Sequence, residues 1–227
     1  MKLNAVALFL MLLSAIPAQG QKGSLYLTHF QNEYTDNLQI WSIARDSSNN
    51  MFFANRKGIL RYNGENWKLI KTPVMPFTMH SREGQERIYI GADQDIGYLR
   101  RGNRGFYHYQ SLMPNKKLKG EFINIEPVDS MLYFMSTRSL IRIDPENPSR
   151  QKTWHASEEE PFTGLIHNDE HVFVNLWNKG LHRLQQDTLF PIVSGFWTRN
   201  QEILFSLPHP DERMIIGTDD NQLYLFD

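Results

Sequence analysis

One stretch of the sequence has the residue types and spacing of a metal-binding motif. His167-Asn168-Asp169-Glu170-His171 matches the pattern His-x-x-Glu-His of zinc peptidases. Zinc needs both imidazoles on one face, which an α-helix provides for residues i and i+4. Here Leu165-Ile166 and Val172-Phe173-Val174 flank a turn-forming Asn168-Asp169 pair. The sequence therefore predicts a strand, a turn and a second strand at this point, and no metal site.

Two charged runs also fit surface loops better than chemistry. Glu158-Glu159-Glu160 could form a cation site or a carboxylate pair, but contiguous carboxylates before a proline are typical of a solvated loop. Residues 115–120 carry three lysines, whose mutual repulsion favours a surface connection. The other six histidines show no ligand spacing, and the chain has no cysteine, which excludes disulfides and thiolate sites. We expect no catalytic residue, no metal and no cofactor.

Five short polar loops are better candidates for binding. They are residues 55–57, 93–95, 136–138, 177–179 and 218–221. Trp177 lies beside Asn178 and Lys179, and Arg56 and Arg138 add charge from two other loops. An aromatic ring next to an amide and a cation suits a sugar or an acidic sugar, so we predict that a small-molecule or oligosaccharide ligand would contact these five residues. The alternative is that the loops are polar only because they face water, with Trp177 packed between sheets.

Residues 40–67 show which elements position these loops. Apolar runs at 40–44, 51–54 and 59–62 are separated by Asp46-Ser47-Ser48-Asn49-Asn50 and by Asn55-Arg56-Lys57-Gly58, and a fourth run begins at Trp67. The intervening residues favour tight turns, and Gly58 can adopt a positive φ without a steric penalty. The stretch therefore predicts a four-stranded antiparallel sheet, which needs other sheets to cover its faces.

The same pattern recurs four more times along the chain. The position of Gly58 is taken in turn by Asp95, Ser139, Gly180 and Gln222, at steps of 37, 44, 41 and 42 residues. The residue after each of these five is apolar in every repeat. A period near forty with four strands per unit is typical of a β-propeller blade. A Greek-key sandwich is the main alternative, but its sequence would not show the same residue types at equivalent positions of successive units.

We therefore predict an all-β chain, a propeller of about five blades. The blades would lie near residues 37–76, 77–118, 119–160, 161–200 and 201–227. Because the fifth repeat reaches Asp227 on its third strand, we expect these blades to be part of a larger propeller. Unless it is completed, such a blade exposes a strand edge that promotes self-association.

The first twenty residues indicate where the protein is located, and the net charge limits its partners. Lys2, the apolar residues 5–13 and Ala18-Gln19-Gly20 have the order of a secretory signal peptide, so residues 1–20 are expected to be removed and 21–227 exported to the periplasm or beyond. The apolar run is too short to span a membrane. A net charge of −1 without a basic stripe argues against nucleic acid as the partner.

Residues 40–67 resemble the blade motif of two-component regulator propellers, which reads Trp-Ser-Ile, Asp-x-x-Gly, a large apolar strand and Gly-Leu-x-Arg-Tyr-Asp-Gly. The matching residues are Trp41-Ser42-Ile43, Asp46, Met51-Phe52-Phe53, Gly58 to Tyr62, Asn63 and Gly64. Asn49-Asn50 replaces the turn glycine, and Ser139 the anchor glycine of the third repeat. Residues 88–99 and 178–181 are similar to units of the triple-tyrosine subgroup.

The resemblance implies an exported, non-catalytic sensor region. In that family further blades, a triple-tyrosine domain, a membrane span and a kinase or DNA-binding output follow, and dimers would form through those downstream parts. Two alternatives stay open on the residues alone. One is a secreted propeller enzyme acting on carbohydrate, a glycoside hydrolase or a lyase, and the other is a protein-binding scaffold.

Overall fold

The computed structural model describes residues 39–82, 84–103, 105–168, 170–210 and 213–227. They belong to one compact unit, Tyr34–Asp227. Within these ranges the chain forms nineteen strands in five antiparallel sheets and one short 3₁₀ helix, η1 (Val193–Thr198). No helix of the described part is long and apolar enough to cross a membrane. The predicted all-β propeller class is confirmed, while the signal peptide expected at residues 1–20 lies outside the described residues.

The strands follow the repeat. Sheet 1 contains β1 (Ser42–Arg45), β2 (Met51–Asn55), β3 (Gly58–Tyr62) and β4 (Trp67–Ile70). Sheet 2 contains β5 (Pro76–Ser81), β6 (Ile88–Ala92), β7 (Asp95–Arg101) and β8 (Tyr107–Ser111). Sheet 3 contains β9 (Asn124–Val128), β10 (Met131–Met135), β11 (Ser139–Ile143) and β12 (Gln151–His155). Sheet 4 contains β13 (Phe162–His167), β14 (Val172–Leu176), β15 (Gly180–Gln185) and β16 (Thr188–Pro191). Sheet 5 contains β17 (Ile203–Pro208), β18 (Met214–Thr218) and β19 (Leu223–Phe226).

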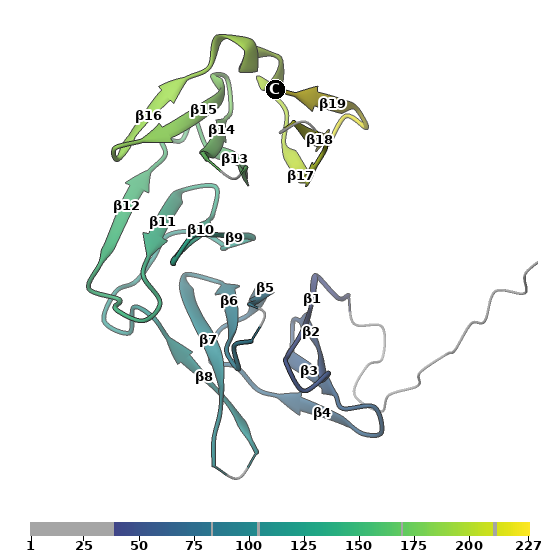
Figure 1. Ribbon diagram of the computed structural model, residues 1–227. Coiled ribbons are helices and arrows are strands. Elements are labelled where there is room, and N and C mark those ends of the chain that lie inside the picture. The colour runs from purple at the N-terminus through teal and green to yellow at the C-terminus, as the bar shows by residue number, and fades with distance from the viewer. Residues whose placement is uncertain (1–38, 83, 104, 169, 211–212) are drawn as a thin grey trace, which may run out of the picture. The chain divides into compact units, whose positions relative to one another are not determined.

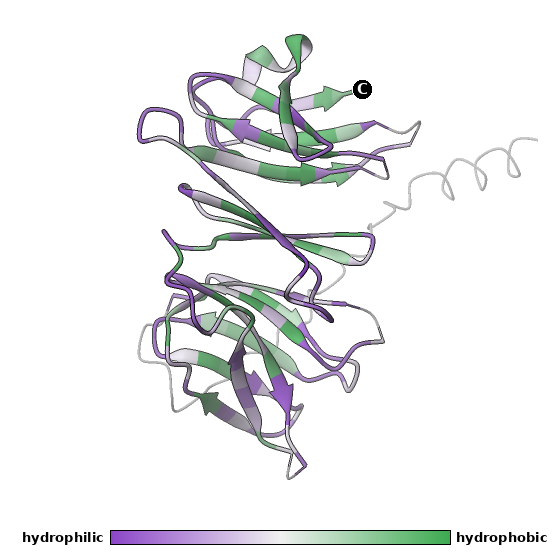
Figure 2. Cartoon of the chain, turned by 90° about the vertical axis from the view of Figure 1, so that its left-hand side faces the viewer, coloured by the Kyte–Doolittle hydropathy of each residue, from purple (hydrophilic) through white to green (hydrophobic). Residues whose placement is uncertain are grey.

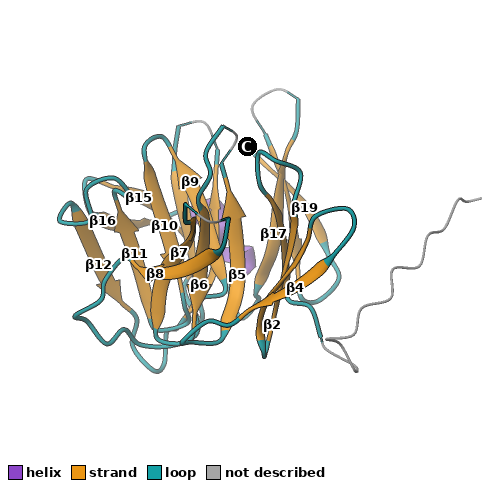
Figure 3. Cartoon of the chain, turned by 90° about the horizontal axis from the view of Figure 1, so that it is seen from below, coloured by secondary structure: helices purple, strands orange, loops and turns teal. Residues whose placement is uncertain are grey.

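Each sheet pairs its strands in sequence order. Figure 1 shows the first strand of each sheet on the inner side and, in sheets 1 to 4, the fourth strand at the rim, and Figure 3 shows the strands from below. The inner strands β1, β5, β9, β13 and β17 contact one another in succession. Hydrogen bonds reinforce two of these contacts, from Met79 N–H to Ser42 Oγ (2.9 Å) and from Asn124 Nδ2 to Leu165 O (3.1 Å). Neighbouring sheets are thus joined near their inner edges.

The turns that depart from the family pattern are formed by other means. Gly58 has the expected positive φ of 128°, and a Cβ there would collide with the Ile70 carbonyl oxygen. Asn49 takes the left-handed conformation (φ 61°) where the pattern has glycine. Ser139 replaces the third glycine, and its N–H donates to Ser136 Oγ at 2.9 Å. Side-chain hydrogen bonds therefore compensate for the missing glycine of the third repeat.

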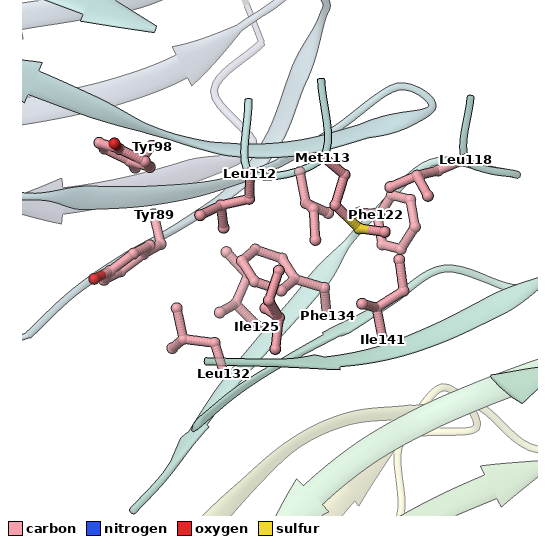
Figure 4. Packing of buried hydrophobic residues seen from close by; sticks show 12 residues of the cluster. Tyr89, Tyr98, Leu112, Met113, Leu118, Phe122, Ile125, Leu132, Phe134 and Ile141 are labelled. Carbon is pink, nitrogen blue, oxygen red and sulfur yellow. The ribbon is translucent and has the colours of Figure 1, made fainter. Parts of the chain in front are cut away.

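The core consists of four apolar clusters, each between two consecutive sheets. Figure 4 shows the cluster between sheets 2 and 3, in which Leu112, Met113 and Leu118 from the connection pack together with Phe122 and with Phe134 of β10, and Leu118 lies beside Phe122. Figure 2 shows the apolar colour concentrated along the strands. Consecutive sheets are therefore packed face to face, which positions the turns at the two ends of the sheets relative to one another.

Sheet 5 has a face that these clusters do not cover. Phe205, Leu207, Leu223 and Leu225 lie on it and are exposed, Leu223 by 69%. The register places Leu207 beside Ile215 and Ile215 beside Leu225, so the apolar residues form a continuous cross-strand row. That these five sheets are part of a larger propeller stays a prediction.

Candidate functional site

The loops between second and third strands lie beside the connections between sheets. Asp93 N–H donates to Met75 O (2.9 Å), Trp177 N–H to Pro161 O (2.9 Å) and Asp219 N–H to Glu202 O (3.1 Å). In an antiparallel four-stranded sheet, the second turn and the exit of the fourth strand are at the same end. The polar loops proposed for binding therefore share one end of the sheets with these connections, which we call the loop face.

Trp177, Asn178 and Lys179 form the turn between β14 and β15. Trp177 is half-buried, whereas Asn178 and Lys179 are exposed. Asn178 has a positive φ of 66°, and its Nδ2 donates to Glu159 O at 3.0 Å. Lys179 Nζ lies 2.7 Å from Glu160 Oε2. The predicted aromatic, amide and cation are thus present together.

The imidazole of His182 lies behind this turn. It is 7% exposed, and its Nδ1 is 2.8 Å from Gly180 O. Burial lowers the pKa of His182 below its usual value, and the positive charge of Lys179 lowers it further, while the hydrogen bond to Gly180 and the charge of Glu160 act in the opposite direction. The base of the turn is therefore a poor place for a positive charge.

The two arginines predicted to bind a ligand, Arg138 and Arg56, lie in different surroundings. Arg138 Nη2 lies 3.1 Å from Glu158 Oε1, so this guanidinium is paired with a carboxylate. Arg56 is exposed on the turn between β2 and β3. The structure does not show these two arginines and Trp177 lining a common cavity.

The acidic run 158–160 is the partner of the candidate cations. Glu158 pairs with Arg138, Glu160 pairs with Lys179, and the Glu159 carbonyl accepts from Asn178. Glu158 is 89% exposed in its side chain, as expected of a solvated loop. Exposed ion pairs of this kind contribute only about 0–1 kcal/mol. An acidic ligand could therefore replace a glutamate at small cost.

The loop face has a cavity that is lined by residues other than the five predicted to bind a ligand. It has a volume of about 680 Å³ and is lined by Asp93, Gln94 and residues 117–121, together with Ile123 and Thr137. The lysine-rich connection 115–120, predicted to be a plain surface loop, is held there by Gln94, whose N–H donates to Gly120 O (3.0 Å) and whose carbonyl accepts from Leu118 N–H (3.3 Å). None of the five predicted binding residues lines this cavity.

The His-x-x-Glu-His stretch has the predicted hairpin geometry. His167 ends β13 and His171 immediately precedes β14, so the two imidazoles lie on different strands. His167 Nδ1 is 2.9 Å from Glu126 Oε2 of β9, and His171 Nε2 is 3.6 Å from Glu170 Oε2. Among the described residues no group of three or more His, Asp or Glu side chains is arranged to hold a metal ion. The absence of a metal stays a prediction.

Another cavity lies between sheets 4 and 5. It has a volume of about 1170 Å³ and includes His167, His171 and His209 together with Phe173 and Phe226. The turns between first and second strands of sheets 4 and 5 contribute to it, and so do the end of β16 and the connection that follows. Sequence reasoning missed this cavity, because its lining comes from three sheets whose contact no local pattern encodes.

The chain resembles several solved structures in fold. Neither a protein-family model nor a curated protein matches the chain. The extracellular domain of the one-component system BT4673 from B. thetaiotaomicron is 14% identical, with a TM-score of 0.64 over 86% of this chain and 28% of that one. The extracellular domain of the hybrid two-component system BT3049 from B. thetaiotaomicron is 13% identical, with a TM-score of 0.64 over 83% and 28%. Virginiamycin B lyase from Staphylococcus aureus is 12% identical, with a TM-score of 0.55 over 83% and 69%.

These likenesses show the fold. Regulator domains and an enzyme share it, so the fold does not select a function. The chain spans less than a third of the length of the two regulator domains. They are nevertheless the class of protein that the blade motif at residues 40–67 resembles. The structural comparison and the sequence resemblance therefore agree on the propeller fold.

Two groups of residues on the loop face were not predicted from the sequence. The first is Glu158 and Glu160, the partners of the candidate cations. The second is residues 117–121 and Ile123 of the cavity beside Gln94, whose other lining residues, Asp93, Gln94 and Thr137, belong to the predicted polar loops. In the sequence these groups stand out only by the charged residues that they place in the connections between sheets. The sequence does not give the path of those connections, so it does not reveal which side chains form pairs.

Proposed function

We propose that the chain is the exported, ligand-binding propeller region of a two-component-type regulator and that it senses without catalysing a reaction. The observation that carries this proposal is the likeness to two extracellular regulator domains over 83–86% of the chain. The blade motif of residues 40–67 supports it independently. The order of charge, apolar run and small residues in positions 1–20 supports export.

The loop face is the proposed ligand site. Trp177 offers a half-buried ring next to the exposed Asn178 and Lys179. A saccharide ring stacked on the indole would leave its hydroxyls or carboxylate within reach of the amide and the ammonium. Because Arg138 is paired with the exposed Glu158 and Lys179 with the half-buried Glu160, an acidic sugar would exchange one carboxylate partner for another. The ligand class we propose is therefore a neutral or acidic oligosaccharide.

A binding screen tests this proposal. The purified chain is titrated with a panel of neutral and uronate-containing oligosaccharides, and affinity and melting temperature are both measured. Trp177→Ala should weaken binding by about 1–3 kcal/mol, the range for losing an aromatic anchor, and leave the melting temperature unchanged. Trp154→Phe on β12 is the control for affinity, which it should leave unchanged, although it removes the hydrogen bond from Trp154 Nε1–H to Asp187 O (2.9 Å).

Two outcomes would contradict the loop-face site. If Trp177 is mainly a packing residue, its replacement by alanine should cost about 3–5 kcal/mol of stability instead. A sharp drop in melting temperature with unchanged affinity would therefore place the ligand elsewhere. No binding of any panel member would remove the support for an oligosaccharide ligand.

The enzyme alternative has its own test. The likeness to virginiamycin B lyase is one of fold, at 12% identity. Prolonged incubation of the purified chain with neutral and uronate-containing polysaccharides should release no fragments. Fragments whose yield scales with the amount of purified chain would favour a hydrolase or lyase over the sensor proposal.

A further inference from the structure

A small cleft lies at the rim of the fold, between sheets 1 and 2. Its volume is about 340 Å³, and it is bounded by β3 and β4 on one side and by the start of β8 on the other. The side chains that matter are Arg61, Lys68, Lys71, Phe106, Tyr107 and His108. None of the five residues proposed for the loop-face site lines this cleft.

The lining of the cleft is strongly positive. It contains Arg61, Lys68 and Lys71, with His108 in addition, and no carboxylate. The sequence on both sides has the same bias. Residues 58–71 carry three lysines and arginines against one glutamate, and Arg100 and Arg101 lie at the end of β7, before the turn into β8. The chain as a whole has a net charge of −1, so positive charge is concentrated at this rim.

The Arg61 guanidinium is held in a fixed orientation. Its Nε and Nη2 donate to Asn50 Oδ1 at 3.0 and 2.6 Å, and its Cζ lies 5.3 Å from the centre of the Tyr107 ring. Asn50 is held in turn by Asp46, whose Oδ2 accepts from Asn50 Nδ2 at 2.7 Å. An arginine has five N–H donors in a rigid fork, so a ligand can still bind to the donors that Asn50 does not use.

Asp46 is the acid nearest to this arrangement, and it does not neutralise it. The carboxylate is 7% exposed and accepts from Tyr107 Oη (2.7 Å), from Asn50 and from Ser48 N–H. The single negative charge of the buried Asp46 is therefore smaller than the combined positive charge of the three cations that line the cleft. Arg101 adds a further positive charge close to Tyr107.

The two lysines are available to a ligand. Lys68 Nζ lies 3.9 Å from the centre of the Phe106 ring, and Phe106 is 49% exposed. Within the described ranges, neither Lys68 nor Lys71 forms an ion pair. On the loop face, by contrast, Lys179 and Arg138 are both paired with glutamates.

We propose that this cleft binds a phosphoryl group, with Arg61 as the oriented donor, Lys68 and Lys71 as mobile cations and Phe106 as an apolar wall. Guanidinium and ammonium groups form strong charge-assisted hydrogen bonds to phosphate oxygens. The volume is at the lower end of the range for small-ligand sites and suits a phosphate with a short organic substituent. Free phosphate and the headgroup of an anionic phospholipid present the same oxygens. The proposal is independent of the sensor role.

The test uses the whole chain and two probes. Inorganic phosphate binding is measured by calorimetry, and vesicle binding by co-sedimentation with phosphatidylcholine, with and without phosphatidylglycerol. The double variant Lys68→Gln/Lys71→Gln should weaken binding of the active probe by about tenfold or more, since it removes two of the three cations. Lys116→Gln/Lys152→Gln, the same change in charge at exposed positions elsewhere, should change it less than about twofold. Unchanged melting temperatures establish that each variant folds.

Each outcome bears on the proposal. Phosphate binding that is lost in the cleft variant supports a site for free phosphate. Binding only to phosphatidylglycerol vesicles, lost in the same variant, supports a headgroup site. Binding of neither probe, or equal loss in the cleft variant and the control, would overturn the proposal.

Discussion

The hydroxyl of Tyr107 donates a 2.7 Å hydrogen bond to Asp46 Oδ2, a carboxylate 61 residues away in the neighbouring sheet. Asp46 lies in the turn between β1 and β2, and Tyr107 begins β8 at the rim of sheet 2. Burial, followed by the hydrogen bond and the charge of Asp46, raises the pKa of Tyr107 to about 12. The pair therefore joins two sheets through a polar contact, in addition to their apolar cluster.

Replacement of Tyr107 by phenylalanine tests this link. The buried Asp46 carboxylate would lose one donor, and hydrogen bonds to charged groups contribute about 1.5–3 kcal/mol. We expect the free energy of unfolding to fall by that amount, measured by urea denaturation. Tyr224→Phe is the control, because the Tyr224 ring stacks on Trp197 and no hydrogen bond of its hydroxyl is seen in the described part. Equal effects of both variants would refute the special role of Tyr107.

The sequence predicted the sheets because their signals are local. The apolar runs predicted at 51–54 and 59–62 lie on β2 and β3, and the predicted counterparts of Gly58 at 95, 139 and 180 each begin the third strand of their sheet. Gly58 marks a turn by its own conformational freedom. The contact of Asp46 with Tyr107 had no such signal, because it depends on how two sheets pack.

The candidate site was predictable only in part. The order of strands was enough to place the polar loops at one end of the sheets. It could not reveal that Glu160 folds back onto Lys179, since that contact depends on the path of the connection between sheets 3 and 4. The rim cleft was missed for the same reason, as Lys68 and Phe106 come from different sheets. Neither residue forms a motif with its sequence neighbours.

Gly164→Ala should destabilise the contact between sheets 4 and 5. Gly164 lies at an irregularity of β13, and a Cβ there would be 2.6 Å from the Cβ of Ile203 on β17. Overpacking of this kind costs about 1–3 kcal/mol, which thermal or urea unfolding would detect. Gly102→Ala is the control, since its nearest neighbour would be Phe106 O at 3.5 Å. A Gly164 variant as stable as the wild type would show that the two sheets separate at little cost.

The exposed face of sheet 5 should cause self-association. In the described structure β19 pairs with β18 alone, and Leu223 and Leu225 are exposed by 69% and 50%. Unpaired edges and apolar faces favour association between chains. We expect light scattering to show dimers or larger species whose population falls in Leu223→Lys/Leu225→Lys. Ile123→Lys, another exposed apolar position, should not have this effect. A stable monomer of the unmodified chain would contradict the prediction.

Stability should decrease as the pH falls below neutrality. Burial lowers the pKa of His80 below its usual 6.5, and the charges of Arg82 and His167 lower it further. Burial also lowers the pKa of His182. When the pH falls through about 6.5, the unfolded chain takes up protons that the folded chain resists, so the unfolded state binds more protons and the free energy of unfolding declines. The expected result is a melting temperature that drops between about pH 7.5 and pH 5.5.

Two variants assign this decline to His80. His80→Gln removes the titrating group, so its melting temperature should depend less steeply on pH than that of the wild type. Arg82→Gln keeps the imidazole but removes one of the charges that lower its pKa. An NMR titration of the His80 ring resonances should therefore give a higher pKa in this variant than in the wild type. A His80 pKa at or above 6.5 in the wild type would contradict the mechanism. So would a pH dependence that is identical in the wild type and His80→Gln, because burial and the neighbouring cations would then not oppose protonation of this imidazole.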